Sequence, residues 1–597
     1  MRHARRSIYW LLLLVWVRLA AGDAYNPPAT YYSSATGTGP TLKTQLRTII
    51  SVMDGVNYGD ARYSPEYTDA DPNIAGNILL IYNRASLSAE WDEGGNLPWN
   101  REHIWPQSHL GANASNGTVN IASDQFNLRP ADTDINNARG NRPFGTDATT
   151  GDHRAVGTQY YPGDADAGDV ARSMFYMATR YSQLTLVDST PSGLQMGDLS
   201  SLINYHFRDA PDAFERRRNH AIYGFAGENS PAITNPYRQE NRNPYVDHPE
   251  YVWSVFVDQA NDSQISISGA TIGGDGSSVR DVNLGRVFTG AAVPAAQNFT
   301  LNKSGMDGTY YEVTTAGAAA SSISGRMNAF RTNQTDSKSI MVGLNTTTAV
   351  AGLKSGTVTV NNLDITASGG AGRGANDAND VFNVSLTVLN HATPSFGSGG
   401  EVASLMYDFG SVVEGTADLM FNFDVFNFGL LPAFTAELDF DSVLGTGDTS
   451  VLTTNLAASA GTLSLAGGAS QSFTAALDTA TPGDFSATYT LSFSDEDLPG
   501  SLTKSLTLTL FGEVTAAGLD GDFNHDGFVD ASDYTVWRDG LDVDYTLEDY
   551  DLWKANFGQS LGGGSGGLGG GSSAVPEPGT IVLFGMMLAS VAAVCRR

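Results

Sequence analysis

The sequence predicts a multidomain protein: a mixed α+β unit, then two β-rich modules, then a small helical unit. Three observations favour this fold class. The 597 residues exceed what one hydrophobic core normally supports. The composition changes near residue 262 to Gly, Ala, Ser, Thr and Val, with alternating strands such as 357–360. A short acidic segment near the C-terminus carries a helical repeat of its own.

The N-terminus predicts export. Three arginines within residues 2–6 precede the apolar run 8–17, and the small residues 20–22 suit a cleavage site. Residues 1–22 are therefore predicted to be a signal peptide, since the apolar run is short for a membrane span. We expect an exported protein that lies at the cell envelope, at the cell surface or outside the cell.

The composition limits both stability and partners. The only cysteine, Cys595, excludes an intramolecular disulfide, although export would permit one. The formal net charge of −30 argues against binding polyanions through bulk electrostatics. Residues 23–258 carry 17 Lys and Arg against 28 Asp and Glu, and 16 of those cations are arginine. Arginine favours bidentate phosphate contacts, so this unit is the better candidate for a phosphate-bearing ligand.

Residues 23–258 contain helical patterns at 41–53 and 169–181 and the heptapeptide Asn100-Arg-Glu-His-Ile-Trp-Pro106. The heptapeptide places Glu102 beside His103. A carboxylate can hold a hard divalent cation, and a neutral imidazole can take a proton from water. Adjacent residues of a strand point to opposite faces, so one site containing both needs a distorted strand or a loop.

A second polar stretch, 123–144, predicts a short helix that Asp132 or Asp134 could cap. Asn136 and Arg139 would then lie at i and i+3 on one face. An amide oxygen can bind a cation, and a guanidinium can balance the charge of a phosphate. The two stretches together indicate a metal-phosphate site.

These motifs resemble a known family. Asn-Arg-Glu-His-x-Trp-Pro, then Asn-Leu-Arg-Pro-Ala-Asp, then Ile-Asn-x-x-Arg-Gly-Asn, is similar to the bacterial secreted endonuclease I family, with further likeness at 168–178 and 241–250. The resemblance covers about residues 25–256. It implies an α+β domain with a ββα-metal (His-Me finger) site at 23–258.

The resemblance implies a secreted endonuclease that hydrolyses phosphodiester bonds of DNA, with RNA left open, at low sequence specificity. His103 would be the general base that activates water. Glu102 and Asn136 would hold one Mg²⁺ or a similar cation. The cation would neutralise charge on the phosphate and on the 3′-oxygen leaving group, leaving a 5′-phosphate product.

Four further residues receive roles by the same resemblance. Arg139 is the expected phosphate clamp, with Arg129 and Arg101 as weaker candidates. Asn127 is expected to brace the loop that carries His103. The sequence departs from the family at Phe126, where a histidine is usual, which leaves open an effect on rate or on metal choice.

Other polar residues are given structural roles, or no role in catalysis. Residues 216–218 are three arginines that would form either a nucleic-acid patch or a solvated helix face. Asp169 and Arg172 are predicted to form a structural pair. Five histidines are given no catalytic role: His109, His153, His206, His220 and His248.

The β-rich part contains an internal repeat. Residues 282–290 resemble 407–415 at an offset of 125, and 384–389 resemble 506–511 at an offset of 122. Repeated strands at this period predict two β-sandwich modules. Their predicted bounds are 262–392 and 396–515.

Residues 518–558 predict a helical module, because Asp533-Tyr-Thr-Val-Trp-Arg538 matches Asp549-Tyr-Asp-Leu-Trp-Lys554. The preceding loop has the oxygen spacing of an EF-hand, with glycine at position 6. It resembles a dockerin repeat and would bind Ca²⁺, although an acidic turn without metal remains the alternative. The predicted ligands are Asp522, Asn524, Asp526, the Phe528 carbonyl, Asp530 and Asp533.

The C-terminal residues predict a linker and a sorting signal. Residues 561–574 are a Gly/Ser linker. Residues 575–597 resemble a PEP-CTERM tail, which implies processing by an exosortase-type system; a plain C-terminal anchor is the alternative. A cohesin-like or envelope partner is expected for 518–558.

Two other functions remain open. The long acidic β-rich half and Phe126 favour an inactive, nuclease-derived envelope or adhesive protein. The metal-phosphate chemistry also fits a phosphodiesterase that is not a nuclease.

Overall fold

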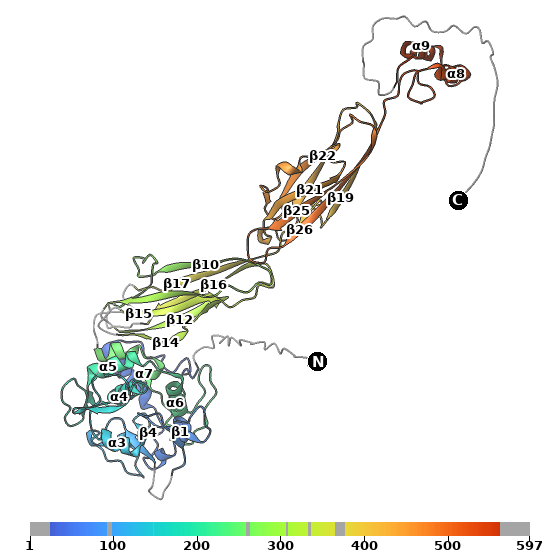
Figure 1. Cartoon of the computed structure of the whole chain (residues 1–597). Coiled ribbons are helices and arrows are strands. Elements are labelled where there is room, and N and C mark those ends of the chain that lie inside the picture. The colour runs from blue at the N-terminus through green and yellow to red at the C-terminus, as the bar shows by residue number, and fades with distance from the viewer. Residues whose placement is uncertain are drawn as a thin grey trace, which may run out of the picture. The chain divides into compact units, whose positions relative to one another are not determined.

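The computed structural model describes residues 24–91, 98–146, 149–257, 263–305, 308–331, 336–363 and 377–560. The predicted signal peptide, linker and sorting tail lie outside these ranges. The chain divides into two compact units, Met1–Leu389 and Asn390–Arg597 (Figure 1). Within the described ranges, no helix is long and apolar enough to cross a bilayer.

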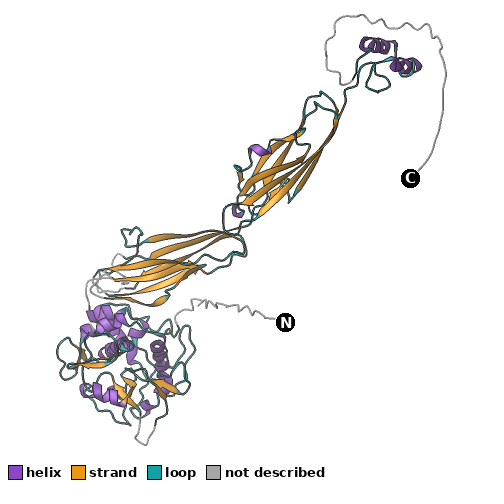
Figure 2. Ribbon diagram, in the orientation of Figure 1, coloured by secondary structure: helices purple, strands orange, loops and turns teal. Residues whose placement is uncertain are grey.

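Helices gather in residues 39–257 and in 531–556, and strands dominate 264–515 (Figure 2). The core of the first region is the helix α4 (Ala167–Arg180), which is buried along nearly its whole length. It packs against α1 (Gly39–Ser51) and α5 (Leu199–Arg208). The predicted helices at 41–53 and 169–181 are therefore present, each beginning two residues earlier, α1 with Pro40 in its first turn.

The remaining strands of this region have two to five residues, and its remaining α-helices have four to eleven. They are α2 (Pro65–Thr68), β1 (Asn77–Leu79), β2 (Ser86–Ser88), β3 (Trp99–His103), β4 (Leu128–Asp132), α3 (Thr133–Arg139), β5 (Arg154–Val156), β6 (Gln159–Tyr161), β7 (Thr185–Leu186), β8 (Gln195–Met196), α6 (Ala213–Tyr223) and α7 (Pro244–Asp247).

A ββα element lies within this region. β3 pairs antiparallel with β4, with Glu102 opposite Arg129 and His103 opposite Leu128. The helix α3 follows β4 directly, because the Asp132 carboxylate caps its first turn and accepts hydrogen bonds from two backbone amides. α3 packs on both strands.

The first β-rich part consists of two sheets, ordered β10-β17-β16-β12-β14 and β13-β15-β11-β9. Apolar residues that alternate along the strands fill the space between them. The strands are β9 (Gln264–Ile267), β10 (Val279–Phe288), β11 (Gln297–Ser304), β12 (Thr309–Gly317), β13 (Ala319–Ser321), β14 (Gly325–Phe330), β15 (Asp336–Leu344), β16 (Gly352–Asn362) and β17 (Asp380–Leu389).

The second β-rich part has sheets ordered β19-β26-β25-β21-β23 and β18-β20-β24-β22. The strands are β18 (Pro394–Ser395), β19 (Ser404–Val413), β20 (Leu419–Asn427), β21 (Leu438–Gly447), β22 (Leu452–Thr454), β23 (Ser464–Leu465), β24 (Ser470–Leu477), β25 (Gly483–Asp495) and β26 (Thr503–Thr515).

The sequence repeat corresponds to a repeated structure. β10 runs parallel to β17 with a register shift, and β19 runs parallel to β26 with the same shift. At the shift, Asn283 accepts the amide of Gly285, and Asp408 accepts the amide of Gly410, each at 2.8 Å. Both glycines have positive φ, which explains why glycine recurs at this offset.

The first β-rich part packs on the helical region within the same compact unit. Phe207 of α5 and Trp253 share an apolar cluster with Tyr310, Ala329 and Leu363. The Tyr310 hydroxyl also donates to the His206 carbonyl at 2.6 Å. The predicted boundary at 258–262 therefore separates two sequence patterns that the fold joins through a shared core.

A buried ion pair reinforces this contact. Arg326 of β14 pairs with Glu250 and donates to the Asp247 carbonyl at 2.8 Å. Glu250 is 1% exposed, and Arg326 is 17% exposed. Burial alone would raise the pKa of Glu250, but the Arg326 charge dominates and holds that pKa at about 2.

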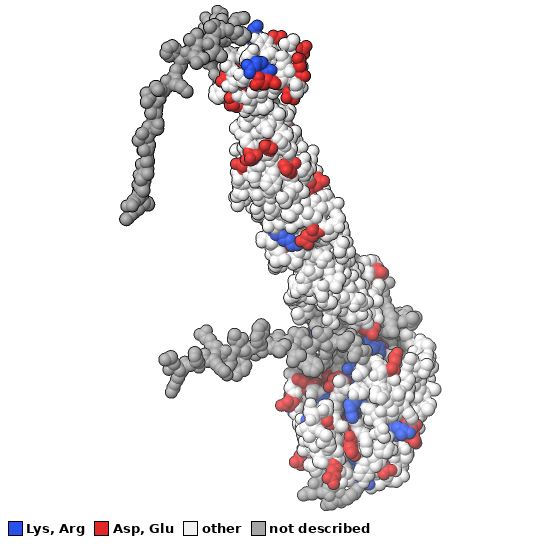
Figure 3. Space-filling model, turned by 90° about the vertical axis from the view of Figure 1, so that its right-hand side faces the viewer, with Lys and Arg blue, Asp and Glu red and all other residues white. Residues whose placement is uncertain are grey.

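The last described module contains α8 (Ala531–Asp539) and α9 (Leu547–Asn556). The Trp537 indole donates to the carbonyl of Thr546, the cap residue of α9, and the Trp553 indole donates to the carbonyl of Asp530, the cap residue of α8. Each repeated tryptophan thus ties its helix to the start of the other, and the repeated Asp533 and Asp549 accept the amides of the two cap residues. On the face drawn in Figure 3, acidic side chains crowd this module, which holds 11 Asp and Glu against two cations.

Removing Arg326 should destabilise the first unit. Arg326→Ala leaves the Glu250 carboxylate buried without its partner, so the unfolding free energy should fall by about 3 kcal/mol. Arg331→Ala is the matched control, because Arg331 belongs to the same β-rich part but pairs with Asp336 at the surface. Its effect should stay below about 1 kcal/mol. Denaturant unfolding of both variants checks this.

The same pair should show a pH signature. Because the folded pKa of Glu250 lies below its ordinary value of 4.5, the pair stabilises the fold above about pH 4.5 and stops doing so as pH falls towards 2. The stability difference between wild type and Glu250→Gln should shrink across that window. Equal effects of Arg326→Ala and Arg331→Ala at pH 7 would refute the ion pair as a source of stability.

Candidate functional site

The strand β3 carries the predicted site residues on two faces. Asn100 and Glu102 face α3, whereas Arg101 and His103 alternate to the other face. The strand stays regular through His103, so the distortion that the sequence reasoning required is absent from this strand. At the strand end the Arg139 guanidinium donates both to the Glu102 side chain and to the backbone carbonyl of His103, and so links the two residues.

Glu102 is held rigidly by one of its oxygens. Its Oε1 accepts hydrogen bonds from the Tyr82 hydroxyl at 2.7 Å and from Arg139 at 3.0 Å. The residue is 3% exposed, and this burial raises the pKa of its carboxyl, against the opposing influence of the Arg139 charge. Both of these hydrogen bonds fall on Oε1, which makes Oε2 the candidate oxygen for a cation.

Asn136 lies on the α3 face that meets β3. Its Nδ2 donates to Asn100 Oδ1 at 2.7 Å, so the amide is oriented by the strand. This leaves Asn136 Oδ1 without a partner in the described part of the chain. A carboxylate oxygen and an amide oxygen are ligands that a hard divalent cation accepts. The donor set therefore fits the predicted cation, although no group of three or more acidic, His or Cys side chains around a metal position occurs in the described ranges.

His103 has one ring nitrogen occupied. Nε2 lies 2.9 Å from the Ala122 carbonyl, and a carbonyl only accepts, so Nε2 carries the proton. Nδ1 then holds the lone pair and has no partner among the residues that the structure describes. Burial lowers the pKa of His103 to about 4. The imidazole is therefore neutral at pH 7, in the tautomer that can accept a proton at Nδ1.

Asn127 braces the segment that follows His103. Its Oδ1 accepts the Trp105 amide at 2.6 Å, and its Nδ2 donates to the Trp105 carbonyl at 3.1 Å. The Asn127 carbonyl also accepts the Ile104 amide. This fully buried asparagine thus fixes the segment after His103, which itself ends strand β3 and does not lie on a loop.

Two of the expected phosphate contacts are corrected by burial. Arg139 is 1% exposed and donates to Glu102 and to the carbonyls of His103 and Ile104. Arg129 is 2% exposed and pairs with Asp69 and Asp169. A guanidinium that is buried and occupied in this way cannot clamp a phosphate from solvent. Arg139 therefore acts on Glu102 and on the strand exit.

Arg101 is half-buried and stacked. Its guanidinium carbon lies 3.7 Å from the centre of the Tyr58 ring and 5.2 Å from that of Trp91. Phe126, the departure from the family pattern, is 2% exposed and packs against Tyr176 at 4.5 Å. Phe126 is therefore part of the core, which removes the reason to expect that it contacts substrate.

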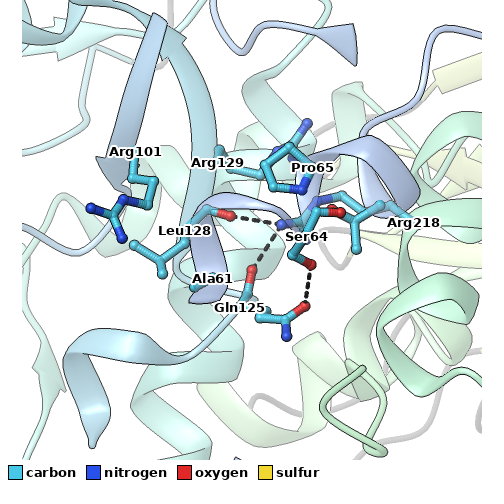
Figure 4. A pocket seen from close by; sticks show the side chains of 9 residues that line it. Ala61, Ser64, Pro65, Arg101, Gln125, Leu128, Arg129 and Arg218 are labelled. Atoms are coloured by element: carbon cyan, nitrogen blue, oxygen red, sulfur yellow. Dashed lines mark hydrogen bonds between the residues drawn. The ribbon is translucent and has the colours of Figure 1, made fainter. Parts of the chain in front are cut away.

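The arginines near Arg101 do not form a ligand pocket. The cavity drawn in Figure 4 is lined by Arg101, Arg129 and Arg218 but has a volume of only about 10 Å³. Arg218 donates to the carbonyls of Gln125 and Leu128. The cavity holds at most a water-sized guest, and its cations are committed to internal partners.

The residues to which no catalytic role was given make structural contacts. Asp169 and Arg172 are buried and paired, and Arg172 also binds Glu215. Arg218 is buried against Asp69, so residues 216–218 do not form a continuous cationic patch. The five other histidines hydrogen-bond to carbonyls or side chains within the fold: His109, His153, His206, His220 and His248.

Sequence reasoning missed Tyr82, Tyr58 and the Ala122 carbonyl. Tyr82 lies 20 residues before Glu102 and reaches it from a turn in which Tyr82 itself has positive φ. Tyr58 stacks on His103, with ring centres 5.5 Å apart and planes 13° from parallel. A tyrosine outside any motif carries no local signal of such a contact, and a backbone carbonyl carries none at all.

In the predicted calcium loop, the side-chain oxygens accept hydrogen bonds from backbone amides of the loop. Asp522 accepts the amides of Asp526 and Gly527, and Asp533 accepts the amides of Phe523, Asn524 and Asp530. Asn524 donates to Asp526 at 2.9 Å. The loop is thus ordered around its two terminal carboxylates. Its all-oxygen chemistry suits Ca²⁺, and Gly527 supplies the positive φ of the turn.

Comparison with known proteins gives a family for the region that contains these residues. Residues 38–237 match the model of the family "Endonuclease I". An "Extracellular ribonuclease" of Bacillus subtilis (strain 168) is 37% identical over 254 residues, which cover 40% of this chain and 82% of the relative. The protein of the same name from Bacillus amyloliquefaciens is 38% identical over 244 residues, which cover 38% and 78%.

The solved structures that align with this chain are only distantly similar to it. A protein of unknown function from Porphyromonas gingivalis W83 aligns over 42% of this chain and 99% of its own, at 12% identity and a TM-score of 0.17. The CfaE adhesin mutant G168D from enterotoxigenic E. coli reaches a TM-score of 0.22 at 7% identity, over 40% of this chain and 98% of its own. Such scores carry no argument about fold or function.

Replacing Arg139 with lysine should destabilise the protein despite the retained charge. A lysine ammonium cannot reproduce the planar set of bonds to Glu102, His103 and Ile104, so buried acceptors lose their donors. We expect a loss of about 3 kcal/mol in unfolding free energy, measured with denaturant. The control is Arg142→Lys, one turn further along, where half-exposed donors serve only helix carbonyls. An Arg139→Lys protein as stable as wild type would refute the buried hydrogen bonds of Arg139 as a source of stability.

Proposed function

The chain belongs to the endonuclease I family, and we propose that residues 23–258 form an exported, divalent-metal-dependent endonuclease of low sequence specificity. One observation carries this proposal. His103 presents a neutral Nδ1 at a strand end while the adjacent Glu102 is fixed by Tyr82 and Arg139 with one oxygen left over. A proton acceptor and an oriented carboxylate oxygen on neighbouring residues are the groups that metal-assisted hydrolysis of a phosphodiester needs.

The residues divide the chemistry between them. Nδ1 of His103 takes a proton from water, and the water oxygen bonds to phosphorus as the bond to the 3′-oxygen breaks. The 3′-oxygen then takes up a proton from solvent, which leaves a 5′-phosphate and a 3′-hydroxyl. Glu102 Oε2 and Asn136 Oδ1 would hold Mg²⁺ or a similar cation. That cation would supply charge neutralisation at the phosphate and the leaving oxygen. Arg139 and Asn127 keep Glu102 and the strand exit in place.

Both DNA and RNA are candidate substrates. The two Bacillus relatives are named ribonucleases, which favours including RNA beside DNA in any assay. The net charge of −11 on residues 23–258 gives no bulk attraction for either polymer. Binding should therefore depend on the cation and on local contacts, and should weaken as salt rises.

Digestion of plasmid DNA and of RNA with Mg²⁺, and then with EDTA, tests the proposal. Wild type should cleave with Mg²⁺ and lose activity with EDTA. His103→Ala should lower the rate by at least about 100-fold, the contribution typical of a general base. Glu102→Ala and Asn136→Ala should shift the Mg²⁺ titration to higher concentration by about 10- to 100-fold.

Arg142→Lys serves as the control for folding and handling. Cleavage by His103→Ala at the wild-type rate would reject the base. Competition between duplex DNA and a small phosphodiester separates a nuclease from a general phosphodiesterase. A wild type that cleaves neither would favour the envelope or adhesive alternative, for which the large β-rich part is the supporting observation.

For the C-terminal part we propose a dockerin-like calcium module, an exosortase-processed tail and an envelope location. The EF-hand spacing of 522–533 and the paired helices α8 and α9 support the first. A cohesin-like or envelope partner would bind residues 518–558. The predicted signal peptide and the names of the relatives support export.

Calcium titration of the whole protein tests the module. Wild type should take up one more Ca²⁺ than Asp526→Ala, because Asp526 is a predicted loop ligand. Asp526 is chosen in preference to Asp533 because Asp533 also accepts backbone amides that hold the loop together. Asp539→Ala is the matched control, since Asp539 is an exposed aspartate at the end of α8 outside the loop. Calorimetry in which the three proteins behave alike would show that 522–533 is an acidic turn without metal.

A further inference from the structure

Tyr58 is the aromatic residue in contact with the ring of His103. The two ring centres lie 5.5 Å apart, and the planes differ by 13°, which describes an offset parallel stack. Tyr58 also lies under Arg101, whose guanidinium carbon is 3.7 Å from the ring centre. Arg101 and His103 are two positions apart on the same face of β3, about 7 Å along the strand. One tyrosine ring therefore touches both.

The hydrogen bond from His103 Nε2 does not by itself aim Nδ1. The side chain turns about its Cα–Cβ and Cβ–Cγ bonds, and a single bond to the Ala122 carbonyl tolerates a range of directions, so it limits this rotation without fixing the ring plane. Rotation of this kind would carry Nδ1 away from a bound phosphate. A second, planar contact is needed to set the ring orientation, and the Tyr58 stack is such a contact.

We propose that Tyr58 is a positioning residue that sets the plane of the His103 imidazole and so directs Nδ1 at the attacking water. This inference rests on the proposed nuclease function of His103. Tyr58 touches no reacting atom; it acts through the ring it stacks on. A misalignment of the base of about 1 Å is enough to cost on the order of 100-fold in rate.

The surroundings hold Tyr58 in place. Its amide donates to the Thr118 carbonyl at 3.1 Å, and the next amide, of Gly59, donates to Asn116. Arg101 donates from its guanidinium to the Tyr58 carbonyl while covering the ring. Arg101 thereby contacts Tyr58 at both its carbonyl and its ring.

The ring, not the hydroxyl, carries this role. No hydrogen bond to the Tyr58 hydroxyl occurs among the described residues, so phenylalanine should replace tyrosine without loss of a contact. The competing explanation is that the half-buried ring stacks a nucleobase, as aromatic residues do in proteins that bind single strands. The two explanations differ in whether kcat or binding responds to the loss of the ring.

Steady-state cleavage of a fluorescent oligonucleotide by the whole protein distinguishes them. Tyr58→Leu should lower kcat by about 10- to 100-fold with KM within about twofold of wild type. Tyr58→Phe should restore most of kcat. Arg101→Gln, which loosens the ring, should lower kcat by less and in the same sense. Tyr63→Leu is the matched control, because this nearby tyrosine packs against Tyr237 in a tilted arrangement instead.

Binding without turnover supplies the second readout. In a His103→Ala background, adding Tyr58→Leu should leave the Kd for the same oligonucleotide unchanged. A rise in KM with unchanged kcat, or weaker binding in that background, would overturn positioning in favour of a base platform. An unchanged kcat for Tyr58→Leu would overturn it outright. Absence of cleavage by wild type would instead reject the nuclease function, which keeps the two failures apart.

Discussion

The pairing of β3 with β4 is the constraint on which the site depends. The register that sets Glu102 opposite Arg129 also ends the ladder at His103. Because side chains alternate along a strand, Glu102 turns to α3 and His103 turns to Tyr58. A slip of one residue would exchange these faces and separate both side chains from their partners. The Asp132 cap then starts α3 at the point that brings Asn136 and Arg139 over β3.

Much of this arrangement could be predicted from the sequence because it is local. Glu102, His103, Asn127 and Asn136 lie in two short stretches, and the capped helix places Asn136 on the correct face. The role of Arg139 could not be predicted, since spacing gives a helix face but not the depth at which it is buried. The sequence pattern around Glu102 and His103 suggests a phosphate site, but the buried Glu102 carboxylate also needs the Arg139 guanidinium as its ion-pair partner.

The contacts from Tyr58 and Tyr82 escape sequence reasoning for a different physical reason. Each comes from 20 or more residues upstream and depends on tertiary packing, with no period or motif to mark it. The repeat of the β-rich parts was visible because glycine with positive φ recurs at a fixed offset. The contact of the first β-rich part with α5 was not visible, because its apolar residues are ordinary core residues on either side of a composition change.

The arginine content of the nuclease region also has a structural explanation. Arg129, Arg139, Arg172, Arg218 and Arg242 are all buried and bound to carboxylates or carbonyls. A planar guanidinium satisfies several buried acceptors at once, which lysine cannot do, so a fold with no disulfide in its 23–258 region gains rigidity from such pairs. Arginine abundance there reflects internal bonding more than phosphate recognition. On the proposed function, an acidic protein of this kind would recognise a polyanion through a bound cation, so the orientation of Glu102 and His103 would matter more than surface charge.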